Sequence, residues 1–207
     1  MKKIIQTLLA FSLLSNINAI AEEYEVIQVY TQDELNLLIS KNQHLQRVKA
    51  DECQLVQDIE AHALKVQEPS YVFLWGDMLA WGVCVERDAK LGMYYINQAA
   101  EQGLLAALEQ LGRYYNKGIL VFEDKHRALT YFREAALQGH LQAQISYITL
   151  LNEGYGSPHD YEDAYRVLYN NVISNSQTKQ KAKVLLANLS KNMPEYVIQR
   201  AQKPDNN

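Results

Sequence analysis

The sequence contains an internal repeat with a period of 36 residues, and this repeat restricts the possible folds more than any other feature. When residues 69–104 are shifted onto residues 105–140, nine positions are identical, whereas two unrelated segments of this length share about two. The identical pairs are Gly76/Gly112, Gly82/Gly118, Val85/Val121, Asp88/Asp124, Tyr95/Tyr131, Ala99/Ala135, Ala100/Ala136, Gln102/Gln138 and Gly103/Gly139. A period of this length is typical of proteins in which each unit buries its apolar face against the next.

A third unit follows at residues 141–176, with a weaker match. It repeats Leu141, Ala143, Asn152, Gly154, Asp160 and Ala164 at the equivalent positions. However, Asn171 and Val172 replace the alanine pair, and the closing glycine is missing. Terminal units of a repeat array commonly diverge in this way, so we expect the third unit to act as a cap.

Each unit is expected to form two helices. Ala107, Leu111 and Tyr115 lie on one stripe at helical spacing, and Gly118 is placed to end that helix in the left-handed conformation. An aspartate precedes the second helix in each unit, as expected of an N-cap residue: Asp88, Asp124 and Asp160. Small residues, namely Gly76, Gly112 and the two alanine pairs, allow neighbouring helices to approach closely. The sequence therefore predicts an all-α fold, an α-solenoid of helix-pair repeats with flanking helices.

The flanking segments are expected to be helical as well. Residues 22–68 comprise an extended lead-in, a helix opened by a capping box at residues 31–34, and a second helix with one apolar face. That face is formed by Cys53, Val56, Ile59, Ala63 and Val66. Residues 177–207 are expected to form a helix over 178–192, a short helix restarted by Pro194, and a frayed tail.

Residues 1–21 have the pattern of a secretory signal peptide. Lys2 and Lys3 precede an apolar run over residues 4–14, and the stretch ends in an A-x-A motif at residues 19–21. The run is too short to span a bilayer, and an uncleaved amphipathic helix is the alternative. We therefore expect a protein that is exported from the cytoplasm and does not span the membrane.

Export also determines how the two cysteines are interpreted. Cys53 and Cys84 would lie in an oxidising compartment, where an even number of cysteines favours a bridge. Such a bridge would close a loop of about 31 residues and contribute roughly 3–4 kcal/mol; two buried free thiols are the alternative. In either case the role is structural.

No catalytic or cofactor-binding motif is present in the sequence. It lacks the nucleophile elbow, the phosphate-binding loop, the HExxH metal motif and the GxGxxG fingerprint. The five histidines lack metal-ligand spacing, and a formal net charge of −4 gives no basis for nucleic-acid binding. We expect no enzymatic activity, no cofactor and no metal.

A stack of helix pairs instead offers a concave surface to a partner. We expect this surface on the face of each first helix that does not carry the repeat positions. The predicted partner-binding strip consists of Phe73, Asp77, Trp81, Glu109, Arg113, Lys117, Ile145, Thr149 and Glu153. Its mixture of aromatic and charged side chains suits a protein better than a metabolite. Trp81 could be its anchor, or alternatively a core residue packed on Cys84.

The repeat positions of residues 107–139 resemble those of the Sel1-like family, a relative of the tetratricopeptide repeats. Longer segments resemble a group of exported Sel1-like proteins of sodium-driven polar flagellar motors. They are residues 30–35, 50–61, 73–84, 107–115, 154–158 and 160–166. This resemblance implies a periplasmic adaptor in a ring around the flagellar basal body, with a MotY-like ring partner and a PomB-like stator subunit.

Two other functions remain open at this point. One is a generic envelope adaptor or regulator that binds another protein through the same strip. The other is a Sel1-like β-lactamase or penicillin-binding protein, which resembles this chain less. Those proteins carry a cysteine pair in each repeat, whereas the second and third repeats here have none.

Overall fold

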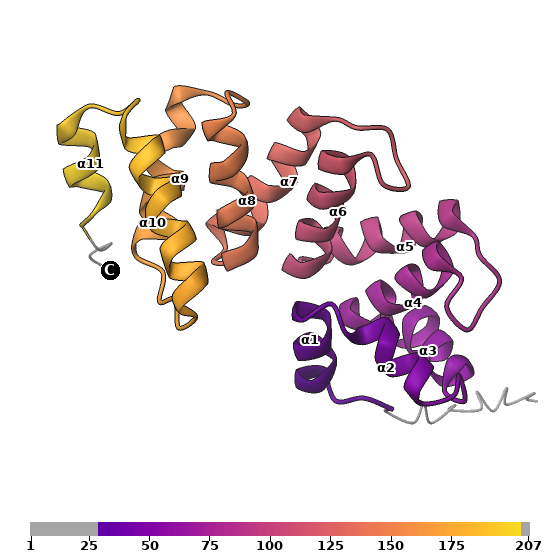
Figure 1. Cartoon of the computed structure of the whole chain (residues 1–207). Coiled ribbons are helices and arrows are strands. Elements are labelled where there is room, and N and C mark those ends of the chain that lie inside the picture. The colour runs from indigo at the N-terminus through magenta and orange to yellow at the C-terminus, as the bar shows by residue number, and fades with distance from the viewer. Residues whose placement is uncertain (1–28, 204–207) are drawn as a thin grey trace, which may run out of the picture.

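The computed structural model describes residues 29–203, and every regular element within this range is a helix (Figure 1). The expected signal peptide, the first part of the expected lead-in and the end of the tail lie outside the described residues. Among the helices of residues 29–203, none is both long and apolar enough to cross a lipid bilayer. The predicted all-α class is therefore confirmed.

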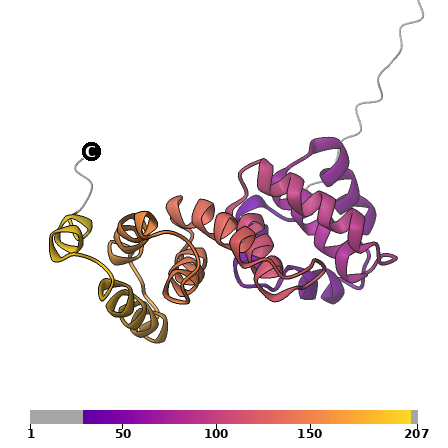
Figure 2. The same cartoon turned by 90° about the horizontal axis from the view of Figure 1, so that it is seen from above.

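Three helix pairs follow one another along the chain and form the solenoid (Figures 1 and 2). The pairs are α4 (Pro69–Trp81) with α5 (Ala89–Glu101), α6 (Leu105–Lys117) with α7 (Lys125–Leu137), and α8 (Leu141–Asn152) with α9 (Tyr161–Tyr169). Each first helix packs on its own second helix, and α7 also packs on α8. One continuous apolar core therefore runs through all three units.

The helix ends follow the capping residues of the repeat in the first two units. Asp88 accepts a hydrogen bond from the backbone N–H of Leu91, and Asp124 accepts one from Arg127, both at 2.9 Å. Gly82 and Gly118 end the first helices with φ of 67° and 65°, a backbone conformation that glycine adopts without a steric penalty.

The third unit begins its second helix differently, and the prediction of Asp160 as an N-cap side chain is wrong. Asp160 precedes α9 without a side-chain capping bond. Its carboxylate instead accepts from the N–H of Ser157 at 2.9 Å, within a capping box that opens the short 3₁₀ helix η2 (Pro158–Asp160). The extra turn arises because Pro158 is favoured at the first position of a helix.

Glycines set the distance between paired helices. A Cβ atom on Gly112 would lie 2.5 Å from the ring of Phe132, and one on Gly76 would lie 2.9 Å from the carbonyl of Gly92. At Gly92 the approach is between backbones, because a Cβ atom there would lie 2.5 Å from backbone atoms of α4. The sequence predicted the close approach at Gly76 and Gly112 but not at Gly92, which lies outside the repeated positions.

The segment before the repeats contains more breaks than its apolar pattern predicts. It forms α1 (Gln32–Ser40), α2 (His44–Ala50), α3 (Val56–Ala61) and a π-helical turn, η1 (His62–Val66). Ile59 and Ala63 are buried as expected, but Val66 is 52% exposed and Cys53 lies in a turn with φ of 60°. The single apolar face predicted from Cys53 to Val66 is therefore wrong at both of its ends.

A disulfide joins Cys53 to Cys84, across 31 residues of sequence. Cys84 lies in the turn between α4 and α5, and its φ of 63° is also left-handed. Two tight turns thus bring the sulfurs together and attach the N-terminal helices to the first repeat.

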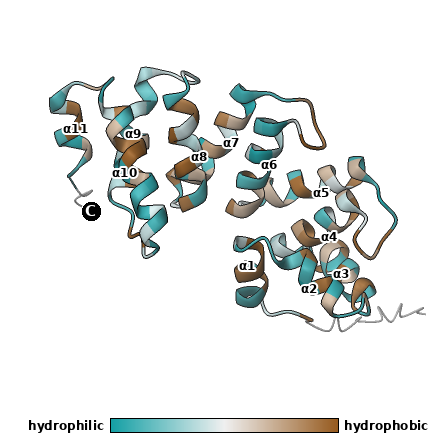
Figure 3. Cartoon of the chain, in the orientation of Figure 1, coloured by the Kyte–Doolittle hydropathy of each residue, from teal (hydrophilic) through white to brown (hydrophobic). Residues whose placement is uncertain are grey.

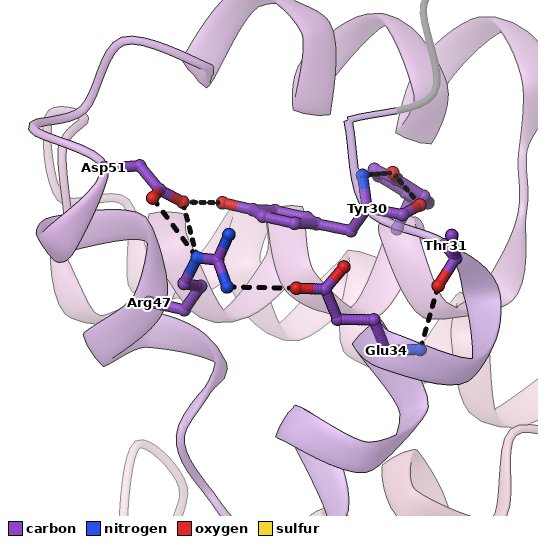
Figure 4. Close-up of polar contacts among 6 residues, drawn as sticks. Tyr30, Thr31, Glu34, Arg47 and Asp51 are labelled. Atoms are coloured by element: carbon purple, nitrogen blue, oxygen red, sulfur yellow. Dashed lines mark hydrogen bonds and ion pairs between the residues drawn. The ribbon is translucent and has the colours of Figure 1, made fainter.

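The beginning of the described chain is anchored by two tyrosines. The N–H of Tyr30 donates to the hydroxyl of Tyr71 at 2.8 Å, and that hydroxyl donates to the carbonyl of Tyr30 at 2.7 Å. At its other end, the hydroxyl of Tyr30 donates to Asp51 at 2.7 Å (Figure 4). Burial and the hydrogen bond to Asp51 raise the pKa of Tyr30, so it remains a neutral donor.

The expected capping box at the start of α1 is only half formed. Thr31 accepts from the N–H of Glu34 at 3.2 Å, but the Glu34 carboxylate turns to Arg47, which also pairs with Asp51 (Figure 4). The reciprocal bond of the box is lost because a cation on α2 competes for Glu34.

The C-terminal segment is close to its prediction. The helix α10 (Ser176–Ser190) begins at Asn175, whose side chain accepts from the N–H of Thr178 at 2.8 Å. Pro194 precedes a last helix, α11 (Glu195–Ala201). On α10, Ala182 and Leu189 are buried against the solenoid core.

Candidate partner-binding surface

The structure divides the predicted strip into a buried part and an exposed part. The buried members are Phe73, Asp77, Glu109 and Ile145, all with exposures of 6% or less. The half-buried or exposed members are Trp81, Arg113, Lys117, Thr149 and Glu153. The expectation that this whole face is free is therefore wrong, and the reason differs along the solenoid.

Over the first unit, α2 covers the strip. The Nε2 atom of His44 lies 2.8 Å from the Oδ2 atom of Asp77, and the His44 ring packs on Phe73 with centroids 5.4 Å apart. Both His44 and Asp77 are almost completely buried, so the Nε2 atom of His44 and the Oδ2 atom of Asp77 satisfy each other inside the core. The Nδ1 atom of His44 is also buried and has no hydrogen-bond partner among the described residues. Sequence periodicity could not reveal this contact, because the two residues are 33 positions apart.

Tyr114 on α6 connects this buried pair to the surface. Its hydroxyl donates to the Oδ1 atom of Asp77 at 3.0 Å and accepts from Gln110 at 2.5 Å. It also accepts from the indole N–H of Trp81 at 2.9 Å. Burial, together with the Asp77 carboxylate, raises the pKa of Tyr114 and keeps the phenol protonated.

Trp81 has properties of both alternatives that the sequence left open. Its ring meets that of Tyr114 edge-on, with centroids 6.2 Å apart, yet the side chain is 43% exposed. The hydrogen bond to Tyr114 fixes the orientation of the indole before any partner arrives. A half-exposed tryptophan whose orientation is already fixed is a typical anchor of a protein interface, because little side-chain entropy is lost on binding.

The middle of the strip lies on α6, where a polar recess of about 320 Å³ opens beside Arg113. Glu109 is 6% exposed, and its Oε2 atom accepts from the Nε of Arg113 at 3.0 Å. Its Oε1 atom is buried and has no hydrogen-bond partner among the described residues. Burial raises the pKa of Glu109, and the charge of Arg113 opposes that shift. The recess also includes His140, whose pKa is lowered by burial and then by Arg113.

Over the third unit, α10 packs on α8. The amide of Asn152 donates to the carbonyl of Leu185 at 3.1 Å, and the hydroxyl of Thr149 donates to the carbonyl of Ile145 at 2.7 Å. Glu153 remains exposed at the end of α8. Since α2 covers one end of the strip and α10 packs near the other, its most accessible part is α6 with the neighbouring Trp81.

Sequence reasoning missed an exposed aromatic residue in the turn between α6 and α7. Phe122 is 97% exposed and lies beside a hollow that Tyr115 and Arg127 also line. The guanidinium of Arg127 lies 4.4 Å from the centre of the Tyr115 ring, which is a favourable cation–π distance. The sequence did contain one signal of this exposure. The equivalent position of the first repeat is Glu86, and a charged residue there indicates that this position of the repeat faces solvent.

The described residues offer no arrangement suited to metal chemistry. Within residues 29–203, no three His, Cys, Asp or Glu side chains are placed to hold a metal ion together. The recess beside Glu109 brings one carboxylate, one guanidinium and one imidazole near each other. This arrangement can accept and donate hydrogen bonds to a docked side chain.

The burial of Glu109 leads to a testable dependence of stability on pH. Because its pKa in the folded chain lies above the unfolded value, the proton-bound form favours folding. That stabilisation is present at low pH and is lost as the pH rises through the folded-state pKa. In Glu109→Gln this loss is absent, so the stability of the variant relative to the parent should increase from about pH 4 to about pH 7.

This difference can be measured by urea unfolding of both proteins across that pH range. Glu101→Gln, at an exposed site on α5, is the matched control and should show a constant difference from the parent. A constant difference for Glu109→Gln as well would show that burial of this carboxylate does not affect its ionisation.

Three comparisons with known proteins agree with this architecture. The Sel1 repeat family matches residues 70–104 and 105–140. A Sel1 repeat protein from Oxalobacter formigenes, known from its crystal structure, superposes with a TM-score of 0.51 over 74% of this chain and 56% of its own, at 21% identity. That likeness concerns the fold alone. The helix pairs and their repeat positions therefore define an α-solenoid of Sel1 repeats.

A curated protein of Vibrio parahaemolyticus is similar over most of its length. It is the sodium-type polar flagellar protein MotX, which is 49% identical over 179 residues, 86% of this chain and 85% of its own. The chain belongs to the MotX family. The resemblance to flagellar motor proteins that the sequence segments indicated is thereby confirmed, including its N-terminal part outside the two matched repeats.

Proposed function

We propose that this protein is a non-enzymatic adaptor of a sodium-driven polar flagellar motor, located in the periplasm. In this role it forms part of a ring at the basal body and recruits or holds the stator. The observation that carries the proposal is the 49% identity to MotX over 86% of the chain, which extends through all three repeats and the N-terminal helices. A MotY-like ring component and a PomB-like stator subunit are its proposed partners.

Two further features support an adaptor outside the cytoplasm. The sequence begins with the pattern of a secretory signal, and Cys53 and Cys84 form a disulfide, which persists in oxidising compartments. The bridge, the buried His44–Asp77 pair and the anchored Tyr30 hold the N-terminal helices on the first repeat.

The open part of the strip is the proposed binding surface. It consists of Trp81, Arg113 and Lys117, with Thr149 and Glu153 further along. Trp81 is oriented by Tyr114, and Arg113 is oriented by Glu109. An interface centred on an ordered aromatic residue and an arginine is typical of protein–protein recognition.

A motility assay tests the motor role directly. Deleting the gene in the source bacterium should leave flagella assembled but unable to rotate, and fluorescent stators should be absent from the basal body. Normal swimming of the deletion strain would exclude the motor function.

A second assay tests the binding surface separately. In the deletion strain, Trp81→Ala combined with Lys117→Glu should reduce the fraction of swimming cells, because loss of an aromatic anchor weakens an interface by about 2 kcal/mol, roughly 30-fold in affinity. The matched control is Tyr94→Ala with Lys90→Glu, an exposed tyrosine and lysine on α5, which should swim normally. Equal swimming of both variants, at equal protein abundance, would place the interface elsewhere.

A further inference from the structure

A groove of about 670 Å³ runs between α9 and α10 at the C-terminal end of the solenoid. Its larger apolar lining residues are Tyr165, Leu168, Tyr169, Val172, Ile173 and Leu186. Two of them are largely accessible to solvent, since Tyr169 is 47% exposed and Val172 is 91% exposed. Apolar surface gathered in one hollow in this way commonly marks an interaction site.

The groove is open because the repeat pattern stops at this point. In each of the three units, the first helix packs on a second helix of the same unit. The helix α10 follows in the position of a fourth first helix, but the next helix, α11, packs on α9. There the amide of Asn170 donates to the carbonyl of Ala201 at 3.3 Å. The apolar residues between α9 and α10 are thus left without the helix that would cover them in a longer array.

The rim of this groove is basic, although the chain as a whole is acidic. Residues 164–194 contain no aspartate or glutamate, whereas the complete chain has 24 acidic and 20 basic residues. Lys179 and Lys183 line the groove from α10. They are four positions apart and therefore lie on one side of the helix. Figure 3 shows hydrophilic residues towards one end of α10 and hydrophobic residues nearer its middle.

We propose that this groove binds a segment of another protein that combines apolar and acidic side chains. The apolar side chains would fill the space between α9 and α10, and the carboxylates would pair with Lys179 and Lys183. The hollow shape favours an inserted peptide, since a helix that attaches to a membrane surface presents a continuous apolar face, whereas the apolar side chains here line a groove between two helices. The proposal does not depend on the motor function, but it gives the adaptor a second docking surface, separate from Trp81.

Selection from a random peptide library displayed on phage tests this chemistry without knowledge of the partner. Peptides selected on the full mature chain should be enriched in aspartate or glutamate next to large apolar residues. Synthetic copies should bind the variant Lys179→Glu/Lys183→Glu at least 10-fold more weakly, and binding to the parent should weaken as salt is raised. Val172→Asp should also weaken binding, because it places a charge in the apolar part of the groove.

The matched control is Lys181→Glu/Lys191→Glu. It makes the same change of charge in the same segment, at two exposed lysines outside the groove. This control should bind the peptides within about twofold of the parent, as expected for charges distant from the interface.

The remaining outcomes would overturn the proposal. Failure to select any peptide, selection of peptides without the acidic and apolar pattern, or equal binding by the two lysine variants would each exclude it. Concentration-dependent dimers that disappear in Lys179→Glu/Lys183→Glu would identify a second copy of this chain as the occupant. Sedimentation of the parent, but not of this variant, with anionic phospholipid vesicles would identify a membrane surface.

Discussion

Phe132→Ala should lower the free energy of unfolding by about 3–5 kcal/mol, the usual cost of removing a buried phenylalanine ring. Phe132 is completely buried, and its ring fills the space above Gly112, where even one added carbon would lie 2.5 Å away. The ring therefore joins α6 to α7, and its removal leaves a cavity between the two helices. Thermal unfolding followed by circular dichroism would measure the loss.

Phe122→Ala provides the matched control ten residues earlier in the chain. Phe122 is 97% exposed, so the same chemical change should alter stability by no more than about 0.5 kcal/mol. If the two variants were equally stable, the packing of α6 on α7 described above would be incorrect. Phe122→Ala can also be tested for motility, because a stable variant with reduced swimming would add the turn at residues 118–124 to the binding surface.

Loss of the disulfide should destabilise the N-terminal half of the protein by about 3–4 kcal/mol. The bridge between Cys53 and Cys84 spans 31 residues, and a closed loop of this length restricts the unfolded chain by about that amount. For a chain of this size the midpoint of thermal unfolding should fall by on the order of 10 °C. The variant Cys53→Ser/Cys84→Ser is the direct test.

Tryptophan fluorescence makes this experiment specific to one region. The chain has two tryptophans, Trp75 and Trp81, and both lie on α4 next to the bridge. Their emission should therefore shift at a lower temperature in the serine variant, whereas the circular dichroism transition, which reports all the helices of the chain, should shift less. Reductant should reproduce the effect in the parent and leave the serine variant unchanged. Identical fluorescence transitions in the oxidised and reduced parent would contradict a stabilising role for the bridge.

Short-range features of the repeat predicted most of the helices and most of their ends. A left-handed glycine at Gly118 and an aspartate N-cap at Asp124 depend on residues within three or four positions, so a single sequence reveals them. Asp160 was predicted wrongly because Ser157 takes the N-cap role three residues earlier, with Pro158 at the first helical position after it. Cys53 was placed on a helix face because the apolar spacing gave no sign of the turn around it.

The candidate binding surface was predictable only in part. The strip was derived from one helix at a time, and that reasoning correctly left Trp81 and Lys117 accessible to solvent. It could not reveal that His44, far away in sequence, packs on Phe73 and Asp77. Glu109 is a similar case, because its burial depends on which segments border the recess, including the end of α1 and the start of α8.

The sequence by itself determined the helix pairs, their order and the caps of the first two units, because hydrogen bonds to nearby backbone groups and apolar periodicity are short-range properties. Only the tertiary structure decided which faces of these helices meet solvent. Burial depends on surfaces that are brought together from distant parts of the chain. Here α2 covers α4, and α11 packs on α9, so that the groove between α9 and α10 stays open. A solenoid built from one repeated unit can therefore have a covered face at its N-terminal end and an open groove at its C-terminal end.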